Sequence, residues 1–258
     1  MTAHLIQDQD VEALSLQSRQ ESLGHIDACM ENYEQFLYSL KAKSKYGGLV
    51  EGYQTTFATF YGAHDRYSDA EKLFMKSLEL QRAELGELNP ATLRTMNNLG
   101  AMYLDVRELS KAQTLLLPTL QAKEKLLGPD NPVTLNTVNN LGNLYAMQSL
   151  FDNARQMYER TLHGYAETYG SAHKTVLESR NNIGEVAMKM GKFEEAKAHF
   201  NIALSGLPAS AESGLSLYIR SNIAVIYKLQ GAYGDAIELY EEVIRGREKL
   251  SGPITHRH

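Results

Sequence analysis

Apolar and polar residues along most of this chain follow two kinds of helical pattern, which alternate in pairs. In the second pattern of the third pair, the apolar positions are Phe151, Ala154, Tyr158 and Leu162. Spacings of three and four residues place side chains on one face of an α-helix. The alanine position stays small in every pair, which marks a place where two helix backbones approach closely. The pattern therefore predicts pairs of packed amphipathic helices.

A short phrase, Asn-Asn-Leu-Gly, marks the first helix of each pair. It occurs at 97–100 and 139–142, and in varied form at 181–184 and 221–224, so successive copies start 42, 42 and 40 residues apart. A fixed period of this size indicates one helix–turn–helix unit stacked repeatedly. We predict an all-α, right-handed α-solenoid of tandem repeats. Its five repeats, numbered one to five, are expected at residues 49–90, 91–132, 133–174, 175–214 and 215–258.

The two ends of the chain are less regular than its middle. Residues 1–48 lack the repeated phrase but keep apolar residues at helical positions. We expect them to form a helical cap or a degenerate repeat, because the end of a solenoid needs a polar outer face. The C-terminal residues 251–258 stop in the middle of a joint, without a dedicated cap. Three interpretations stay open: the last helix is its own cap, the array continues in a longer chain, or the chain self-associates there.

The repeat resembles a known family. The step Leu99-Gly100-x-x-Tyr103, followed nine residues later by Ala112, is similar to the tetratricopeptide repeat, whose usual length is about 34 residues. The repeats of this chain are longer. The extra residues at 84–90 and 123–132 are predicted to add helical turns that stop at a glycine and restart after a proline. The long form resembles the kinesin-light-chain type over residues 50–253. The fourth repeat departs from this type in two ways: Ala187 stands where the other repeats have an aromatic residue, and the joint at 206–210 is shortened.

Composition and charge narrow the classes of function. A single cysteine, Cys29, excludes an intrachain disulfide and fits a reducing compartment. The chain has neither a signal-peptide start nor the roughly eighteen consecutive apolar residues of a membrane helix, so we expect a cytoplasmic protein. A net charge of −5 argues against nucleic acid as a partner. The short basic cluster at 41–45 is interpreted as a solvated helix end.

No pattern of catalytic or metal-binding residues stands out. The pair Gly191-Lys192 is followed by Phe193 rather than the serine or threonine of a phosphate loop. The eight histidines include no pair at helical metal-ligand spacing. We therefore expect a protein that is not an enzyme, with no cofactor and no metal.

The candidate binding residues lie on the first helices, which the resemblance places along the concave face of the solenoid. The second asparagine of the phrase recurs at Asn98, Asn140, Asn182 and Asn222. An asparagine amide both donates and accepts hydrogen bonds, so this row can hold the backbone of an extended peptide. The same helical stripe adds Arg94, Asn136, Asn143 and Lys189, of which the two cations can contact a ligand carboxylate.

Alternatives remain for the row and for the chain. The four asparagines can instead bond the neighbouring first helix and hold the stack in register without any ligand. The function predicted is a non-enzymatic scaffold or adaptor for a protein or an extended peptide. The second hypothesis is a small-molecule-binding protein or enzyme with a pocket inside the superhelix, suggested by the 15 tyrosines and by Ala187, which interrupts the aromatic column. A third, self-association through the last repeat, depends only on the uncapped end.

Overall fold

The computed structural model describes residues 47–208 and 213–251, together with Ala28. Within these residues it contains ten α-helices and no strand, which confirms the predicted all-α fold of tandem helix pairs. The expected cap over residues 1–48 and the tail after Ser251 lie almost wholly outside the described residues. The described chain divides into two compact units, which we call unit 1 (residues 47–95) and unit 2 (residues 96–250).

Unit 1 is a helix pair followed by the start of a third helix. Helix α2 (Gly47–Ala63) packs on α3 (Tyr67–Glu84), and the unit ends inside α4 (Pro90–Asp105). Ala58 and Ala70 are completely buried, in agreement with the small-residue positions of the sequence pattern. The hydroxyl group of Thr55 lies 3.2 Å from that of Ser77 and 3.2 Å from that of Thr95.

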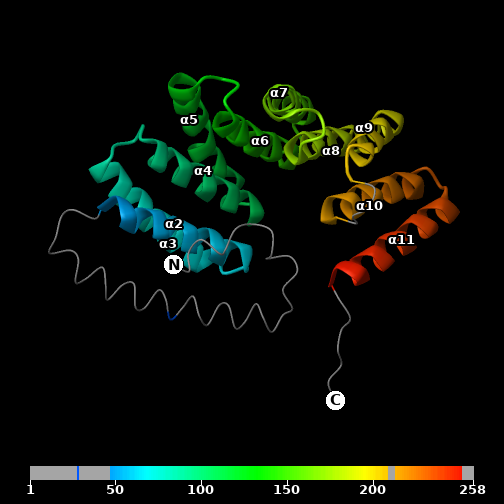
Figure 1. Ribbon diagram of the computed structural model, residues 1–258, viewed down its shortest axis with the longest axis horizontal. Helices are drawn as coiled ribbons and strands as arrows, with labels where there is room; N and C mark the ends of the chain where they lie inside the picture. Colours follow the sequence, from blue (N-terminus) through cyan, green and yellow to red (C-terminus); the bar gives the residue numbers. More distant parts are fainter. Residues whose placement is uncertain (1–27, 29–46, 209–212, 252–258) are drawn as a thin grey trace, which may run out of the picture. The chain divides into compact units, whose positions relative to one another are not determined.

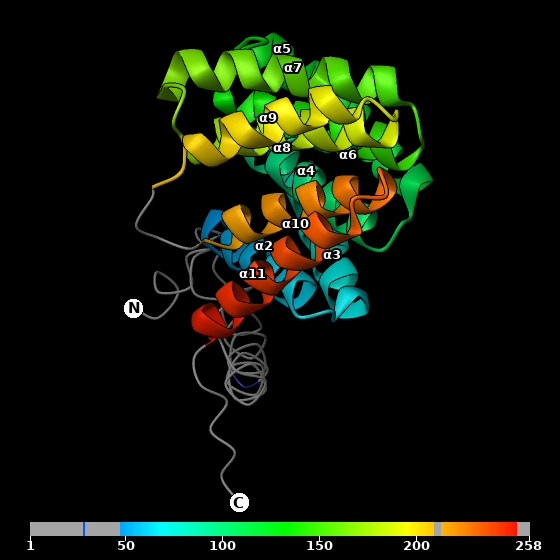
Figure 2. The same ribbon diagram turned by 90° about the vertical axis from the view of Figure 1, so that its right-hand side faces the viewer.

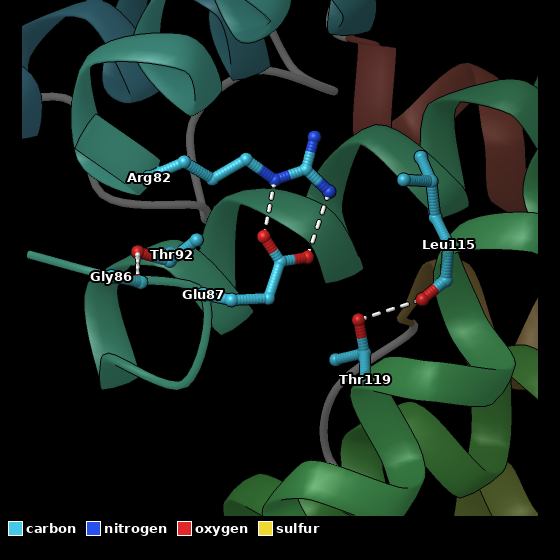
Figure 3. Close-up of polar contacts among 6 residues, drawn as sticks. All are labelled: Arg82, Gly86, Glu87, Thr92, Leu115 and Thr119. Atoms are coloured by element: carbon cyan, nitrogen blue, oxygen red, sulfur yellow. Dashed lines mark hydrogen bonds and ion pairs between the residues drawn. The ribbon is translucent and has the colours of Figure 1, made fainter.

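The joint between α3 and α4 is held by side chains within unit 1 (Figure 3). Arg82 donates two hydrogen bonds to the Glu87 carboxylate, at 2.6 and 2.8 Å. The Thr92 hydroxyl, in the first turn of α4, donates to the Gly86 carbonyl at 2.9 Å. Residues 85–89 therefore form an ordered turn, and the additional helical turns predicted for 84–90 are absent from this joint.

Unit 2 contains the rest of α4 and seven further helices. In chain order these are α5 (Leu109–Leu127), α6 (Pro132–Met147), α7 (Phe151–Tyr169), α8 (Lys174–Lys189), α9 (Phe193–Ser205), α10 (Gly214–Leu229) and α11 (Tyr233–Ser251). The first helices α6 and α8 lie side by side in one layer, and the second helices α7 and α9 lie in the other (Figures 1 and 2). Each of these second helices thus packs on its own first helix and on the first helix of the next repeat.

The glycines of the repeated phrase allow this close packing. A Cβ atom on Gly142 would lie 2.5 Å from the ring of Tyr158, and one on Gly184 would lie 2.6 Å from the ring of Phe200. These distances are shorter than any ordinary contact between carbon atoms, so a larger residue would force the two helices apart. The predicted role of this position at the helix–helix seam is confirmed.

The turn inside each repeat is fixed by the backbone. Its central residue has a left-handed conformation with φ between 61° and 79°, whether it is Asp65, Arg107, Ser149, Gly191 or Gly231. The amide of the following residue donates to a carbonyl five residues earlier, for example Leu150 to Tyr145 at 2.8 Å and Lys192 to Ala187 at 2.9 Å. Since this bond needs no side chain, Ala187 replaces an aromatic residue without changing the turn.

The joints between repeats vary more than the turns. Helix α5 stops at Leu127 before Gly128, whose φ is 92°, and α6 restarts at Pro132 behind the N-cap Asn131, as predicted. In the fourth repeat, α9 has only 13 residues, whereas α7 has 19. Helix α9 ends at Ser205, three residues before Pro208, which has no amide hydrogen for a helix to continue. The joint after α9, residues 206–213, is longer than the joint 170–173 before α8, so the prediction of a shortened joint is wrong. The shorter period of the fourth repeat comes from its shorter second helix.

Candidate functional site

The asparagine pairs of unit 2 form a continuous row of hydrogen bonds along the first helices. In each step, Nδ2 of the second asparagine donates to Oδ1 of the first asparagine in the preceding repeat. The bonds run from Asn140 to Asn97 at 3.2 Å, from Asn182 to Asn139 at 3.2 Å and from Asn222 to Asn181 at 3.4 Å. We call these residues, with Asn98, the asparagine ladder, and the surface of the first helices that carries it the ladder face.

The ladder divides into buried and accessible members. Asn97, Asn181 and Asn140 are buried, and Asn140 is 8% exposed. Buried amides need hydrogen-bond partners, so these residues hold adjacent first helices in register. Asn98, Asn182 and Asn222 are only half-buried. An amide has two N–H groups and a carbonyl oxygen with two lone pairs. Asn182 donates one ladder bond and accepts one hydrogen bond from Asn181, so one of its N–H groups can still meet a ligand. Asn222 donates to both Asn181 and Glu185, which leaves its carbonyl oxygen for a ligand.

The other predicted site residues differ in their surroundings. Asn136 and Lys189 are exposed on first helices of unit 2. Asn143 accepts a 2.6 Å hydrogen bond from the buried Tyr158 hydroxyl, so it supports the packing of α6 on α7. Arg94 is exposed as well, but it belongs to unit 1, whereas the other predicted residues belong to unit 2.

Glu185 is the charged centre of the ladder face. Its carboxylate accepts hydrogen bonds from Nδ2 of Asn181 at 2.6 Å and of Asn222 at 3.5 Å. The hydroxyl of Tyr218 also lies against it: burial and then the Glu185 charge raise the pKa of Tyr218, which is 46% exposed. The same two causes raise the pKa of Tyr158. A carboxylate, a phenol and two amides therefore converge on the ladder face between α8 and α10.

Neither Glu185 nor Tyr218 is among the binding residues selected from the sequence. A signal for Glu185 was present, because it follows Asn182 by three residues and so lies on the same helical stripe. No such signal joined it to Tyr218, which comes from the next first helix. Their contact depends on the packing of α8 against α10.

A buried lysine is linked through a threonine hydroxyl to the other end of the asparagine ladder. Lys123 on α5 is 3% exposed, and its ammonium donates to the Thr137 hydroxyl at 2.8 Å and to the Val133 carbonyl at 3.2 Å. The Thr137 hydroxyl in turn donates to Asn97 Oδ1 at 2.9 Å. Burial lowers the pKa of Lys123 to about 8. Its place seven residues after the buried Leu116, on the apolar face, was the only sign of this burial in the sequence.

The described structure gives no support to the hypothesis of a small-molecule pocket at Ala187. Ala187 is buried in a cluster with Ala196, Phe200 and Ile226, so side chains fill the place where a cavity was expected. Within residues 47–208 and 213–251, no group of three or more histidine, cysteine, aspartate or glutamate side chains is arranged to hold a metal ion. None of the described helices combines the length and the apolar character that crossing a membrane requires.

Comparisons with known proteins agree on the repeat. A tetratricopeptide repeat family model matches residues 53–117, 97–167 and 175–249. No curated protein matches the chain. Among solved structures, BtubC (BKLC) from P. vanneervenii is similar with a TM-score of 0.71 and 17% identity, covering 97% of this chain and 96% of its own. The repeats of a putative kinesin light chain from P. anserina are similar with a TM-score of 0.66 and 21% identity, covering 80% of this chain and 97% of theirs.

Proposed function

The chain belongs to the tetratricopeptide repeat family, whose members generally act as protein-interaction scaffolds, and from this premise we propose that its ladder face binds an extended peptide segment of a partner protein. The proposal assigns peptide contact to the first helices α8 and α10 of unit 2. The observation that carries it is the convergence of accessible hydrogen-bonding groups from Asn182, Glu185, Tyr218 and Asn222 on one surface.

The half-buried amides suit a peptide backbone. The ladder bonds fix the side chains of Asn182 and Asn222 through their neighbours Asn139 and Asn181, so these amides lose little additional freedom when a ligand binds. Their remaining donor and acceptor groups can pair with the C=O and N–H groups of an extended strand. The buried Asn140, by contrast, serves the stack rather than the ligand.

The charged groups on this face add a preference for the ligand's side chains. Glu185 offers carboxylate oxygens to donors on the ligand, and Tyr218 offers an exposed ring and a hydroxyl. Lys189 is exposed one helical turn after Glu185, so it can meet a ligand carboxylate. The favoured ligand is therefore a polar, extended peptide rather than an apolar helix.

Selection from a random peptide library displayed on phage, with the full chain as bait, tests this proposal. Selected peptides would be synthesised with a fluorophore and their affinities measured by anisotropy. We expect Asn182→Ala/Asn222→Ala to weaken binding by at least about tenfold, because two amides that meet the backbone are lost. Lys189→Ala should weaken the binding of peptides that contain acidic residues.

A matched control uses asparagines outside the ladder face. Asn153 and Asn201 are exposed on the second helices α7 and α9, so Asn153→Ala/Asn201→Ala should leave the affinity unchanged. Thermal unfolding of both double variants shows whether the stack itself is intact. Selected peptides that bind the ladder variant and the wild type equally well would contradict the proposal. Stabilisation by a metabolite, with no peptide selected, would favour the small-molecule hypothesis instead.

A further inference from the structure

The last described helix, α11, exposes a row of large apolar side chains. Tyr233 is 64% exposed, Ile237 is 59% exposed and Ile244 is 55% exposed. Their spacing of four and seven residues places them on one face of the helix. A neighbouring face of the helix packs into the fifth repeat, where Ala236 and Val243 are buried and Leu239 contacts the cluster around Ile223. We call Tyr233, Ile237 and Ile244 the α11 stripe.

The equivalent apolar positions in earlier repeats are covered. Leu162 occupies the place of Ile244 in α7 and packs against a cluster that contains Ile183 and Val186 of the next first helix. Leu204 occupies this place in α9 and packs against Ile219 and Ile223 of α10. In the earlier repeats, an apolar residue at this position therefore takes part in a contact between two helices. Ile244 can make the same kind of contact with a further helix.

Ile237 shows that this contact differs from the one between repeats. The preceding second helices of unit 2 carry Gln113, Arg155 and Lys197 at the equivalent position. Arg155 forms a 2.8 Å ion pair with Glu195 of the next second helix, and Gln113 accepts a hydrogen bond from Gln148. A contact with one more repeat would therefore be polar at this point. An isoleucine at this point fits an apolar seam instead.

The charges of α11 indicate which helix completes that seam. Its N-terminal half carries four acidic residues, Asp235, Glu238, Glu241 and Glu242, and its C-terminal half carries three basic residues, Arg245, Arg247 and Lys249, with one acidic residue, Glu248, so the first half is net negative and the second net positive. Two copies of such a helix attract each other when they run antiparallel, because each acidic half then faces a basic half. The same arrangement places Ile237 of each copy opposite Ile244 of the other. The helix is therefore complementary to itself in both shape and charge.

We propose that two copies of this chain associate through their α11 stripes, antiparallel about a two-fold axis. The contact is isologous, since the same surface is used on both copies. It buries Ile237 and Ile244 in the middle of the seam and brings the net acidic N-terminal half of each α11 beside the net basic C-terminal half of the other. Because α11 is a second helix, the contact leaves the ladder face outside the interface.

Sedimentation velocity on the full chain, over a wide range of protein concentrations, tests this interface. The wild type should sediment as a dimer whose proportion increases with concentration. Ile237→Glu/Ile244→Glu should weaken dimerisation by at least about tenfold, because two charges enter an apolar seam. The control Leu126→Glu, which changes an equally exposed leucine at the end of α5, should dimerise like the wild type. Far-UV circular dichroism checks that each variant keeps its helices.

Charge-reversed variants distinguish this partner from any other. The chain with Glu238→Lys/Glu241→Lys has basic residues in both halves of α11, and the chain with Arg245→Glu/Arg247→Glu has acidic residues in both. Each should remain monomeric alone, and a mixture of the two should form a heterodimer. A monomeric wild type, a dimer that the stripe variant leaves intact, or a mixture that stays monomeric would overturn the proposal, and the covering partner would then be a different segment or protein.

Discussion

The junction between the second and third repeats and the junction between the fourth and fifth both pack a second helix on the next first helix, but the side chains that fill them are of opposite chemistry. In the first, the buried positions hold Lys123 and Thr137, whose side chains bond each other. In the second, the equivalent positions hold Leu207 and Ile219, which pack together in an apolar cluster. We call these the polar junction and the apolar junction.

The repeat therefore determines how the helices pack, but it does not determine whether polar or apolar side chains fill the space between them. Both junctions keep the ladder bond, from Asn140 to Asn97 and from Asn222 to Asn181. The polar junction depends on every hydrogen bond being made, because a buried ammonium without partners is costly. The apolar junction depends only on volume and shape. The polar junction should therefore be the more sensitive to single substitutions and to pH.

The largest effect is expected from removing a hydroxyl at the polar junction. Thr137→Ile leaves the Lys123 ammonium with the Val133 carbonyl as its remaining hydrogen-bond acceptor, so the free energy of unfolding at neutral pH should fall by about 3 kcal/mol. Adding Lys123→Leu reproduces the chemistry of Leu207 and Ile219 and should remove this cost. Urea unfolding of both single variants and the double variant measures the coupling. Additive single effects would show that the two side chains are independent.

The second prediction uses pH. Folded Lys123 loses its proton at about pH 8, and the unfolded residue does so near its ordinary pKa of 10.5. Below about pH 8 the folded chain carries the full cost of the buried ammonium, and its stability rises as the pH increases from there towards about 10. Lys123→Leu should therefore exceed the wild type by about 2 kcal/mol at neutral pH and lose this advantage by about pH 10.

Comparing the two proteins at each pH separates Lys123 from the rest of the chain. The buried tyrosines, such as Tyr165 with its pKa raised to about 12, titrate alike in both proteins and cancel in the difference. A difference in stability that stays constant with pH would mean that Lys123 does not titrate in this range.

The third prediction concerns the seam between the two helices of a single repeat in unit 2. Gly142→Ala and Gly184→Ala each push a Cβ atom into an aromatic ring, and each should destabilise the chain by about 1–2 kcal/mol. Gly234→Ala is the control, because open space surrounds its Cβ position in the first turn of α11, and it should stabilise the helix by about 0.5 kcal/mol. Thermal unfolding measures all three. Unequal costs at the two seam glycines would show that the helix pairs of the third and fourth repeats differ in tightness.

The smallest effect is expected in unit 1. Gln81 stands at the position equivalent to Lys123 and is completely buried, and neither polar atom of its amide has a hydrogen-bond partner in the described structure. Gln81→Leu should raise the free energy of unfolding by on the order of 1 kcal/mol, because an unpaired buried amide is removed. Chemical denaturation provides the measurement. A loss of stability would mean that the amide is paired in solution.

The sequence predicted the features that sterics alone decides. Repetition of small residues at Gly142 and Ala154 reveals where helices meet, because nothing larger fits there. The position of the second asparagine on the first helices could be predicted in the same way. The partner of its amide could not, because the choice between Asn97 and a ligand depends on how two neighbouring helices are rotated. The burial of Lys123 was also hidden, since lysine is usually a surface residue.

The direction of the ladder has a consequence for how such an array grows. In every ladder bond the donor amide belongs to the later repeat and the acceptor oxygen to the repeat before it, as in the joints of a head-to-tail polymer. In the fifth repeat the acceptor position is Ser221, a hydroxyl in place of the amide oxygen. A further repeat stacked on α10 would find a shorter side chain there, and the series of amide bonds would end. In polymer terms, a unit added after the fifth repeat would join it through a hydroxyl rather than through an amide.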